Sequence, residues 1–321
     1  MRELFLKFFL VLTSLLISFL ILEIFLRMVG HKTFNLKNEI STLSLFKNDD
    51  VLGWTTEPGD FSIKLNNKNI NYKILNDGSR FTGNQKNSSK SQIIFIGGSF
   101  TFGDAIDDEE TIPYKIQENS NKYNVKNFGV SGFGTYQSYL NLKKIYRNNN
   151  NIKYVIYLFI DHHEVRNAGD ASWLEALNSL SKEPVSIPYV SINKENKFIE
   201  HSPITYVTFN LSKYSVLITK LQKKIMRLKF YSKNNNQELI TQKILVMINE
   251  MSKENNNEFI FINLLSKKDK IEKYKIFSES NNIRYGNCVI DLNEKYIVKN
   301  NGHPNNLANK EYSKCISKFI Q

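Results

Sequence analysis

Short apolar runs alternate with longer amphipathic segments over the last two thirds of the chain. The runs at residues 93–96, 154–160 and 259–264 carry almost no polar side chains, which is typical of strands buried on both faces of a parallel sheet. Residues 123–130 and 288–292 are expected to be the second and fifth strands. Strand and helix alternate five times, and this order predicts a parallel sheet with helices on both faces. We therefore expect an α/β fold of three layers around five parallel strands.

Amphipathic segments follow each of these runs. Apolar positions spaced by three and four residues predict helices over residues 108–117, 135–146, 237–251, 267–280 and 305–320. Residues 164–235 interrupt the alternation, because three prolines lie among short extended pieces and residues 212–228 form a basic helical pattern. We interpret residues 91–321 as the main domain and residues 164–235 as an insertion over its site.

The first 30 residues form the most apolar stretch of the chain. Residues 8–22 carry no charge, and about 20 apolar residues cross the hydrocarbon core of a bilayer. A cleavable signal peptide is the alternative, but no Ala-x-Ala-like site follows the run. We expect residues 1–30 to be a single-pass membrane anchor. Basic residues flank the run on both sides, and a short tail before a first anchor usually stays inside, which places the main domain in the periplasm or at the cell surface.

Residues 31–90 are polar and rich in turn residues, with weak periodicity. Trp54, Phe61, Ile63 and Tyr72 indicate packing rather than a disordered linker. We expect a neck, or a small layer of β-hairpins, that leads into the main domain.

The composition of the 321-residue chain restricts its partners. A formal net charge of +12 could suit nucleic acid. The lysines are scattered, however, and no basic arm gathers them, so we do not expect nucleic acid as a partner. An anionic membrane surface or an acidic polysaccharide remains compatible with this charge.

Two cysteines, Cys288 and Cys315, are too few for a usual zinc site. Outside the cytoplasm they could form one disulfide, and elsewhere they would be buried free thiols. We expect no metal and no other cofactor.

A serine follows the first predicted strand. Gly97 and Gly98 end that strand and permit a tight turn, and Ser99 comes next. Open parallel sheets bind ligands at the carboxyl ends of their strands, so the Ser99 hydroxyl is expected to face such a crevice. The alternative is a glycine-rich turn whose serine only caps a helix.

Other reactive side chains follow the remaining strands. A glycine-rich turn with Gly132 follows the second strand, and Asp161 and His163 follow the third. His303 precedes the last helix, where Asn305 already supplies a helix cap and leaves the imidazole free. A nucleophilic serine needs a base within hydrogen-bond reach and fixed donors for the oxyanion. His303 is the best base by position.

Three short blocks resemble those of the SGNH/GDSL hydrolases. Residues 97–103 (Gly-Gly-Ser-Phe-Thr-Phe-Gly) are similar to the block Gly-Asp-Ser-x-x-x-Gly, with Gly98 at the aspartate position. Residues 127–132 (Asn-x-Gly-x-Ser-Gly) look like the second block, and residues 300–303 (Asn-Asn-Gly-His) look like the fifth, Asp-x-x-His. The resemblance covers roughly residues 50–321 and implies the flavodoxin-like SGNH hydrolase fold.

By this resemblance Ser99 is the nucleophile and His303 the base, and the N–H groups of Ser99 and Gly132 form the oxyanion hole. The family's triad aspartate is Asn300 here, and loss of that carboxylate can cost about 10⁴ in rate. Three alternatives follow: a Ser–His dyad with Asn300 or another carbonyl orienting the ring, a carboxylate from elsewhere in the chain, or a weak enzyme.

The family's third block, Gly-x-Asn-Asp, is missing. Its place holds Asp161, His163 and Arg166, of which Asp161 or a histidine could supply a third oxyanion contact. Asp161 and His163 could also act as a second acid–base pair. The alternative is a solvated turn with Arg166 in a salt bridge. Residues 52–54 and 76–80 look like the membrane-anchored bacterial subgroup of the family.

The resemblance implies an O-acyl or O-acetyl esterase, or an acyltransferase. With an anchor and an outside domain, the expected substrate is an acylated cell-surface glycan or a lipid-linked sugar. The alternative is a degenerate, non-catalytic glycan-binding member of the same fold that serves in polysaccharide assembly.

Overall fold

A sheet of five parallel strands forms the centre of the protein, whose computed structural model describes residues 2–34, 45–65, 67–84, 90–180, 185–231 and 236–320. Every neighbouring pair in the sheet is parallel: β5 (Gln92–Gly97), β6 (Asn124–Asn127), β7 (Ile152–Ile160), β10 (Glu258–Leu265) and β11 (Arg284–Asn287). The spatial order β11-β10-β7-β5-β6 is the 2-1-3-4-5 order of flavodoxin-like sheets. The predicted α/β fold with five parallel strands is confirmed.

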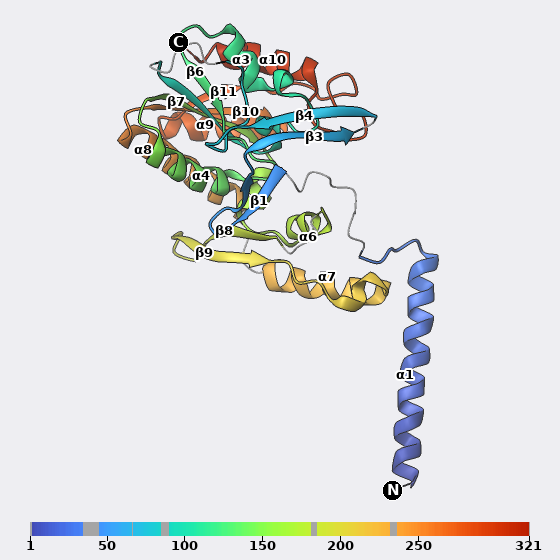
Figure 1. Ribbon diagram of the computed structural model, residues 1–321. Coiled ribbons are helices and arrows are strands. Elements are labelled where there is room, and N and C mark those ends of the chain that lie inside the picture. Colours follow the sequence, from blue (N-terminus) through green and yellow to red (C-terminus); the bar gives the residue numbers. More distant parts are fainter. Residues whose placement is uncertain are drawn as a thin grey trace.

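Helices cover both faces of this sheet (Figure 1). They are α3 (Ile112–Asn119), α4 (Thr135–Asn148), α8 (Gln237–Glu254), α9 (Lys268–Ser280) and α10 (Asn306–Ser317). Ile94 and Ile96 of β5 pack in the cluster that contains α4, α8 and α9, whereas Ile93 and Phe95 pack in the cluster of α3 and α10. This division follows from the alternation of side chains along a strand. It explains why β5 is apolar at consecutive positions.

Two predicted elements differ from the structure. The fifth strand is Arg284–Asn287, and residues 288–292 follow it without regular structure. The strand lies at the edge of the sheet, so its short and mostly polar sequence lacks an apolar run. The first helix after β5 is α2 (Ser99–Phe102), which begins at Ser99 itself, and a 3₁₀ turn (Asp108–Glu110) then precedes α3.

A disulfide joins Cys288, just after β11, to Cys315 on α10. Of the two alternatives for these cysteines, the structure therefore has the bonded one. The bond fastens the last helix to the edge of the sheet.

Two antiparallel hairpins precede the sheet: β1 (Phe46–Asp49) with β2 (Gly53–Thr56), and β3 (Gly59–Leu65) with β4 (Lys68–Ile74). They lie in the segment expected to be a neck or hairpin layer, of which residues 35–44, 66 and 85–89 fall outside the described part. The boundary between this layer and the main domain stays a prediction.

The segment after β7, which we interpret as an insertion, has four helical segments and one hairpin among its described residues. Its elements are α5 (His163–Asn167), α6 (Ala171–Leu180), β8 (Ser186–Ile192), β9 (Phe198–Thr205), a 3₁₀ turn (Asn210–Lys213) and α7 (Val216–Tyr231). At the other end of the chain, α1 (Arg2–Met28) leaves the body as a single helix with exposed apolar side chains (Figure 1). It is long and apolar enough to cross a membrane, while the direction of insertion stays a prediction.

Candidate active site

Ser99 is the first residue of α2, directly beyond the carboxyl end of β5. The strand order reverses between β5 and β7, and doubly wound sheets bind ligands at such a point. Gly97 makes the turn possible with a φ of +148°. A Cβ added there would lie 2.2 Å from Thr101 Oγ1 and 2.9 Å from the carbonyl oxygen of Leu158, so only glycine fits. The Ser99 residue is 4% exposed.

His303 lies against the turn that carries Ser99. The centroid of its ring is 5.9 Å from that of Phe100, and its Nε2 is 3.6 Å from Oδ2 of Asp104. The backbone N–H of Asp104 in turn donates to the carbonyl oxygen of Ser99 at 3.1 Å. Residues about two hundred positions apart therefore meet at one edge of the sheet. In the described part of the chain, the Ser99 hydroxyl and His303 make no direct hydrogen bond.

Asn301 orients the imidazole. Its Oδ1 lies 2.5 Å from His303 Nδ1 and also accepts the backbone N–H of His303 at 3.4 Å. An acceptor on Nδ1 keeps the proton on that nitrogen and leaves Nε2 of the neutral ring free to accept another. Asn300, the residue expected to hold the ring, is exposed and has a φ of +61°. The contact to Nδ1 thus comes from Asn301 rather than from Asn300.

Asp104 is a site residue that the sequence did not reveal. Its Oδ2 accepts a hydrogen bond of 2.6 Å from Ser131 Oγ and lies 3.6 Å from His303 Nε2. It thereby connects the turn after β6 with His303. Asp104 belongs to none of the three sequence blocks, and only its nearness to Ser99 in the chain could have suggested it.

The turn after β6 presents a free backbone donor. Gly132 has a φ of +83°, and a Cβ added there would lie 2.9 Å from the ring of Trp54. Trp54 fixes this turn, because its Nε1 donates to the carbonyl oxygen of Ser131 at 2.9 Å. Neither the N–H of Ser99 nor that of Gly132 has an acceptor within the described ranges. Free donors beside a nucleophile are what an oxyanion requires.

His163 and Asp161 do not form the expected acid–base pair. His163 is buried, and its Nδ1 lies 2.6 Å from the hydroxyl of Tyr157. Its Nε2 has no partner among the described residues and points at Gly98, where an added Cβ would lie 2.7 Å away. The Asp161 carboxylate instead lies 3.9 Å from Nε2 of His162. A second acid–base pair is therefore not assembled.

Arg166 is buried as well, which contradicts the alternative of a solvated turn. Its Nη1 donates to the carbonyl oxygen of Phe133 at 2.9 Å, and its guanidinium lies 4.3 Å from the ring centre of Trp173. Burial lowers the pKa of Arg166 to about 10. A Cβ at Gly98 would be 3.2 Å from Nη1. Arg166 and His163 thus fill the space that an aspartate at position 98 would need. The glycine in the first block therefore fits the side chains that stand in place of the third block.

Stability is expected to fall in acid because of His163. Burial, followed by the nearby charges of Arg166 and His162, holds the pKa of its imidazole well below 6.5. The unfolded chain binds a proton near pH 6.5 and the folded chain does not, so this contribution is present above pH 6.5 and is lost as the pH falls below it. The loss approaches about 1.4 kcal/mol per pH unit.

Urea unfolding of the full chain between pH 7.5 and pH 5, beside His163→Phe, measures this effect. The stability of the wild type should fall more steeply than that of the variant. Parallel curves would show that His163 titrates normally in the folded protein.

Within the described ranges, no three His, Cys, Asp or Glu side chains gather as metal ligands would. No family model matches the sequence, and no curated protein matches it.

Several solved structures are similar to this chain over most of its length. A lipolytic protein of the G-D-S-L family from Veillonella parvula matches at 11% identity and a TM-score of 0.42, over 72% of this chain and 98% of that one. A putative lipolytic protein of the same family from Desulfitobacterium hafniense matches at 14% and 0.38, over 72% and 100%. AlinE4, an SGNH-hydrolase family esterase, matches at 12% and 0.37, over 73% and 99%. Two of these three solved structures are named for the G-D-S-L family and one for the SGNH hydrolases, whose blocks the sequence also resembles.

Proposed function

We propose that the protein is a serine ester hydrolase or acyltransferase of the SGNH type. Ser99 Oγ attacks the ester carbonyl carbon while His303 Nε2 accepts the hydroxyl proton. The alcohol leaves with that proton, and water or a sugar hydroxyl then takes the acyl group from Ser99. The observation that supports this proposal is that His303 packs against the turn that carries Ser99. Asn301 contacts Nδ1 of its ring, so Nε2 can accept a proton.

The base must approach the nucleophile for this reaction. Nε2 now lies beside Asp104, and catalytic hydrogen bonds often tighten only when substrate binds. His303 follows Gly302, which has a φ of +83° and open space around its Cβ position. The imidazole is also partly exposed, and we propose that it rotates toward Ser99 when substrate binds.

We infer that Asp104 supplies the negative charge that is missing at position 300, but from the Nε2 side of the ring instead of the Nδ1 side. When His303 turns to Ser99 and takes the proton, the nearby Asp104 carboxylate, which lies 3.6 Å from Nε2 before this turn, stabilises the imidazolium. The backbone N–H groups of Ser99 and Gly132 hold the oxyanion in the same step. Asp161 and His163 have no direct part in this mechanism.

Asp104→Asn tests this role. Because Asn keeps an oxygen for the Ser131 hydroxyl and loses only the charge, we expect kcat to fall about 10²-fold with little change in KM. Steady-state kinetics of both proteins measures the effect. Asp161→Asn is the matched control, since that carboxylate lies beside His162 alone, and its kcat should stay near that of the wild type. Equal kcat values for Asp104→Asn and the wild type would rule the role out.

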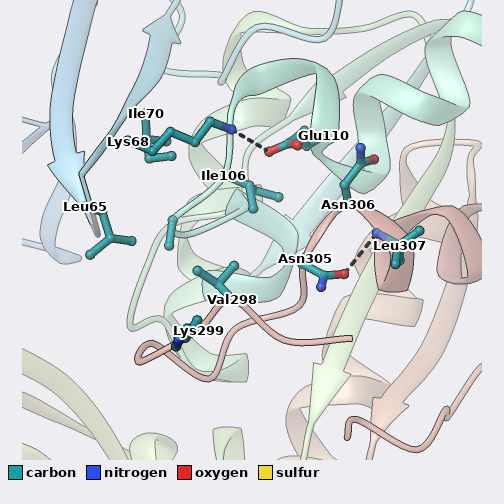
Figure 2. Close-up of a pocket in the computed structure, with 11 residues that line it drawn as sticks. Leu65, Lys68, Ile70, Ile106, Glu110, Val298, Lys299, Asn305, Asn306 and Leu307 are labelled. Carbon is teal, nitrogen blue, oxygen red and sulfur yellow. Dashed lines mark hydrogen bonds and ion pairs between the residues drawn. The ribbon is translucent and has the colours of Figure 1, made fainter. Parts of the chain in front are cut away.

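A groove of about 330 Å³ lies beside the candidate site and could hold part of the substrate. Figure 2 shows Leu65 and Ile106 on its apolar sides and the ion pair of Lys68 with Glu110 at its rim. Val298 also lines it, and the N–H of Val298 bonds the carbonyl oxygen of His303 at 2.8 Å. Mixed polar and apolar walls suit a saccharide, so we propose an O-acylated, for example O-acetylated, glycan or lipid-linked sugar as substrate.

Two measurements on the full chain in detergent test the reaction class. The protein should turn over p-nitrophenyl acetate, and a fluorophosphonate should label the peptide that contains Ser99, as read by mass spectrometry. The absence of both turnover and label would exclude a serine mechanism. Binding of an acylated glycan without turnover would then favour the non-catalytic alternative.

A further inference from the structure

One face of α7 combines exposed apolar and basic side chains. The apolar ones are spaced by four and three residues: Leu221 (51% exposed), Ile225 (39%) and Leu228 (69%). The basic ones have the same spacing and lie beside them: Lys220, Lys224 and Arg227. The opposite face is buried against the body of the protein and carries Thr219, Gln222 and Met226.

This arrangement does not suit a helix exposed only to water. A surface helix normally turns its apolar stripe toward the core, whereas the buried face of α7 is partly polar. None of Lys220, Lys224 and Arg227 lies within 4 Å of a carboxylate of any described residue, although the neighbouring Lys223 pairs with Glu175 at 2.6 Å. Apolar and basic side chains together on one face are typical of helices that lie in the interface of an anionic bilayer.

The start of α7 is fastened to the end of α1. The carboxylate of Glu23 on α1 accepts hydrogen bonds from Ser215 Oγ at 2.8 Å and from the backbone N–H groups of Val216 and Leu217, each at 2.9 Å. One turn later, Arg27 Nη2 donates to a carbonyl oxygen of the segment before α7 at 2.6 Å. These contacts hold α7 at the carboxyl end of the apolar helix.

The length of α1 indicates the level of α7 relative to a bilayer. The 27 residues of α1 extend about 40 Å, and the hydrocarbon core of a bilayer is about 30 Å thick. Figure 1 shows α1 extending away from the body, with α7 roughly perpendicular to it and one end of α7 beside the carboxyl-terminal part of α1. If the apolar part of α1 occupies the core, Glu23 and the start of α7 lie at the level of the lipid headgroups.

We propose that α7 docks flat on the bilayer that α1 crosses. Leu221, Ile225 and Leu228 enter the headgroup region, and the three neighbouring cations bind the phosphates of anionic phospholipids. Leu211 and Tyr214, just before α7, are also exposed. This docking is independent of the proposed ester chemistry but requires α1 to be inserted.

Docking of α7 would also fix the candidate site relative to the membrane. Met226 on the buried face of α7 belongs to the same apolar cluster as Trp54, Phe133 and Trp173. Trp54 and Trp173 flank Gly132, the proposed oxyanion donor. One packed cluster thus connects α7 with the turn after β6. If α7 lies on the bilayer, the candidate site is held close to the membrane surface, which suits a membrane-bound substrate.

A fluorescent label on α7 tests the docking. The full chain is placed in nanodiscs of phosphatidylcholine with or without phosphatidylglycerol, and Leu228→Cys is labelled with an environment-sensitive dye. The only native cysteines are disulfide-bonded, so the label goes to the new thiol. We expect a blue-shifted emission that doxyl-labelled lipid quenches, more strongly with phosphatidylglycerol and less in high salt. Lys275→Cys on α9 carries the control label, which should stay unquenched.

Loss of charge provides the second measurement. The triple variant Lys220→Gln, Lys224→Gln, Arg227→Gln should lower the ratio of docked to undocked α7 about 100-fold in anionic nanodiscs. Its turnover of p-nitrophenyl acetate should be unchanged, so a failure of docking and a failure of the esterase proposal are read separately. Water-like emission at position 228 in anionic nanodiscs, or a chain that alkaline carbonate extracts from them, would overturn the proposal. So would quenching that is equal with and without the three charges.

Discussion

Ser99→Ala is expected to lower kcat for ester hydrolysis about 10⁶-fold and to abolish labelling by a fluorophosphonate. Removal of the hydroxyl leaves no atom to form the acyl-enzyme at the turn between β5 and α2, while the oxyanion donors and the fold remain. Rapid-mixing kinetics with p-nitrophenyl acetate measures the effect, because the burst of the first turnover disappears together with the steady-state rate.

Ser131→Ala is the matched control. Ser131 precedes Gly132 in the turn after β6 and also carries a hydroxyl in this site. Its Oγ, however, donates to Asp104. Its loss should leave labelling intact and change kcat far less. Labelling that persists in Ser99→Ala and disappears in Ser131→Ala would show that the nucleophile has been wrongly assigned.

The parts of the fold that the sequence revealed are those buried on both faces. β5, β7 and β10 lie inside the sheet, so each reads as an unbroken apolar run. The edge strand β11 pairs with β10 and has no such run, so the sequence pattern predicts the strand at the apolar residues that follow it. The four-residue α2 is too short to show a helical period.

The site divides along similar lines. Ser99 and His303 lie in sequence blocks whose spacing is visible in one chain, and the structure brings both to the same turn. Asp104 and Asn301 act through contacts that only the folded chain creates. The expected pairing of Asp161 with His163 failed because α5 begins at His163 and turns that side chain inward, onto Tyr157 and Gly98.

Arg80→Met is expected to cost about 3–5 kcal/mol of unfolding free energy, a large part of the 5–15 kcal/mol typical of a domain. Arg80 is 1% exposed and ends the segment at residues 76–80 that resembles the anchored subgroup. Its Nε donates to Asp108 at 2.7 Å, and its Nη1 donates to the carbonyl oxygens of Phe102 at 3.0 Å and Gly103 at 2.5 Å. The ring centre of Tyr72 lies 4.3 Å from the guanidinium. Methionine would fill much of the space but remove the charged donor from the Gly103 carbonyl oxygen and from the buried Asp108 carboxylate, which keeps the backbone N–H of Lys73.

Urea unfolding of the full chain measures this cost. Lys314→Met, which breaks the exposed ion pair with Glu311, is the control and should change stability by less than about 1 kcal/mol. Arg80→Lys should recover little of the lost stability. A single ammonium group cannot reach Asp108 and the carbonyl oxygens of Phe102 and Gly103 at the same time. Because Arg80 holds the carboxyl end of the helix that begins at Ser99, catalysis should be lost together with stability. A change below 1 kcal/mol for Arg80→Met would mean that hydrophobic packing of β3–β4 alone fixes the nucleophile turn.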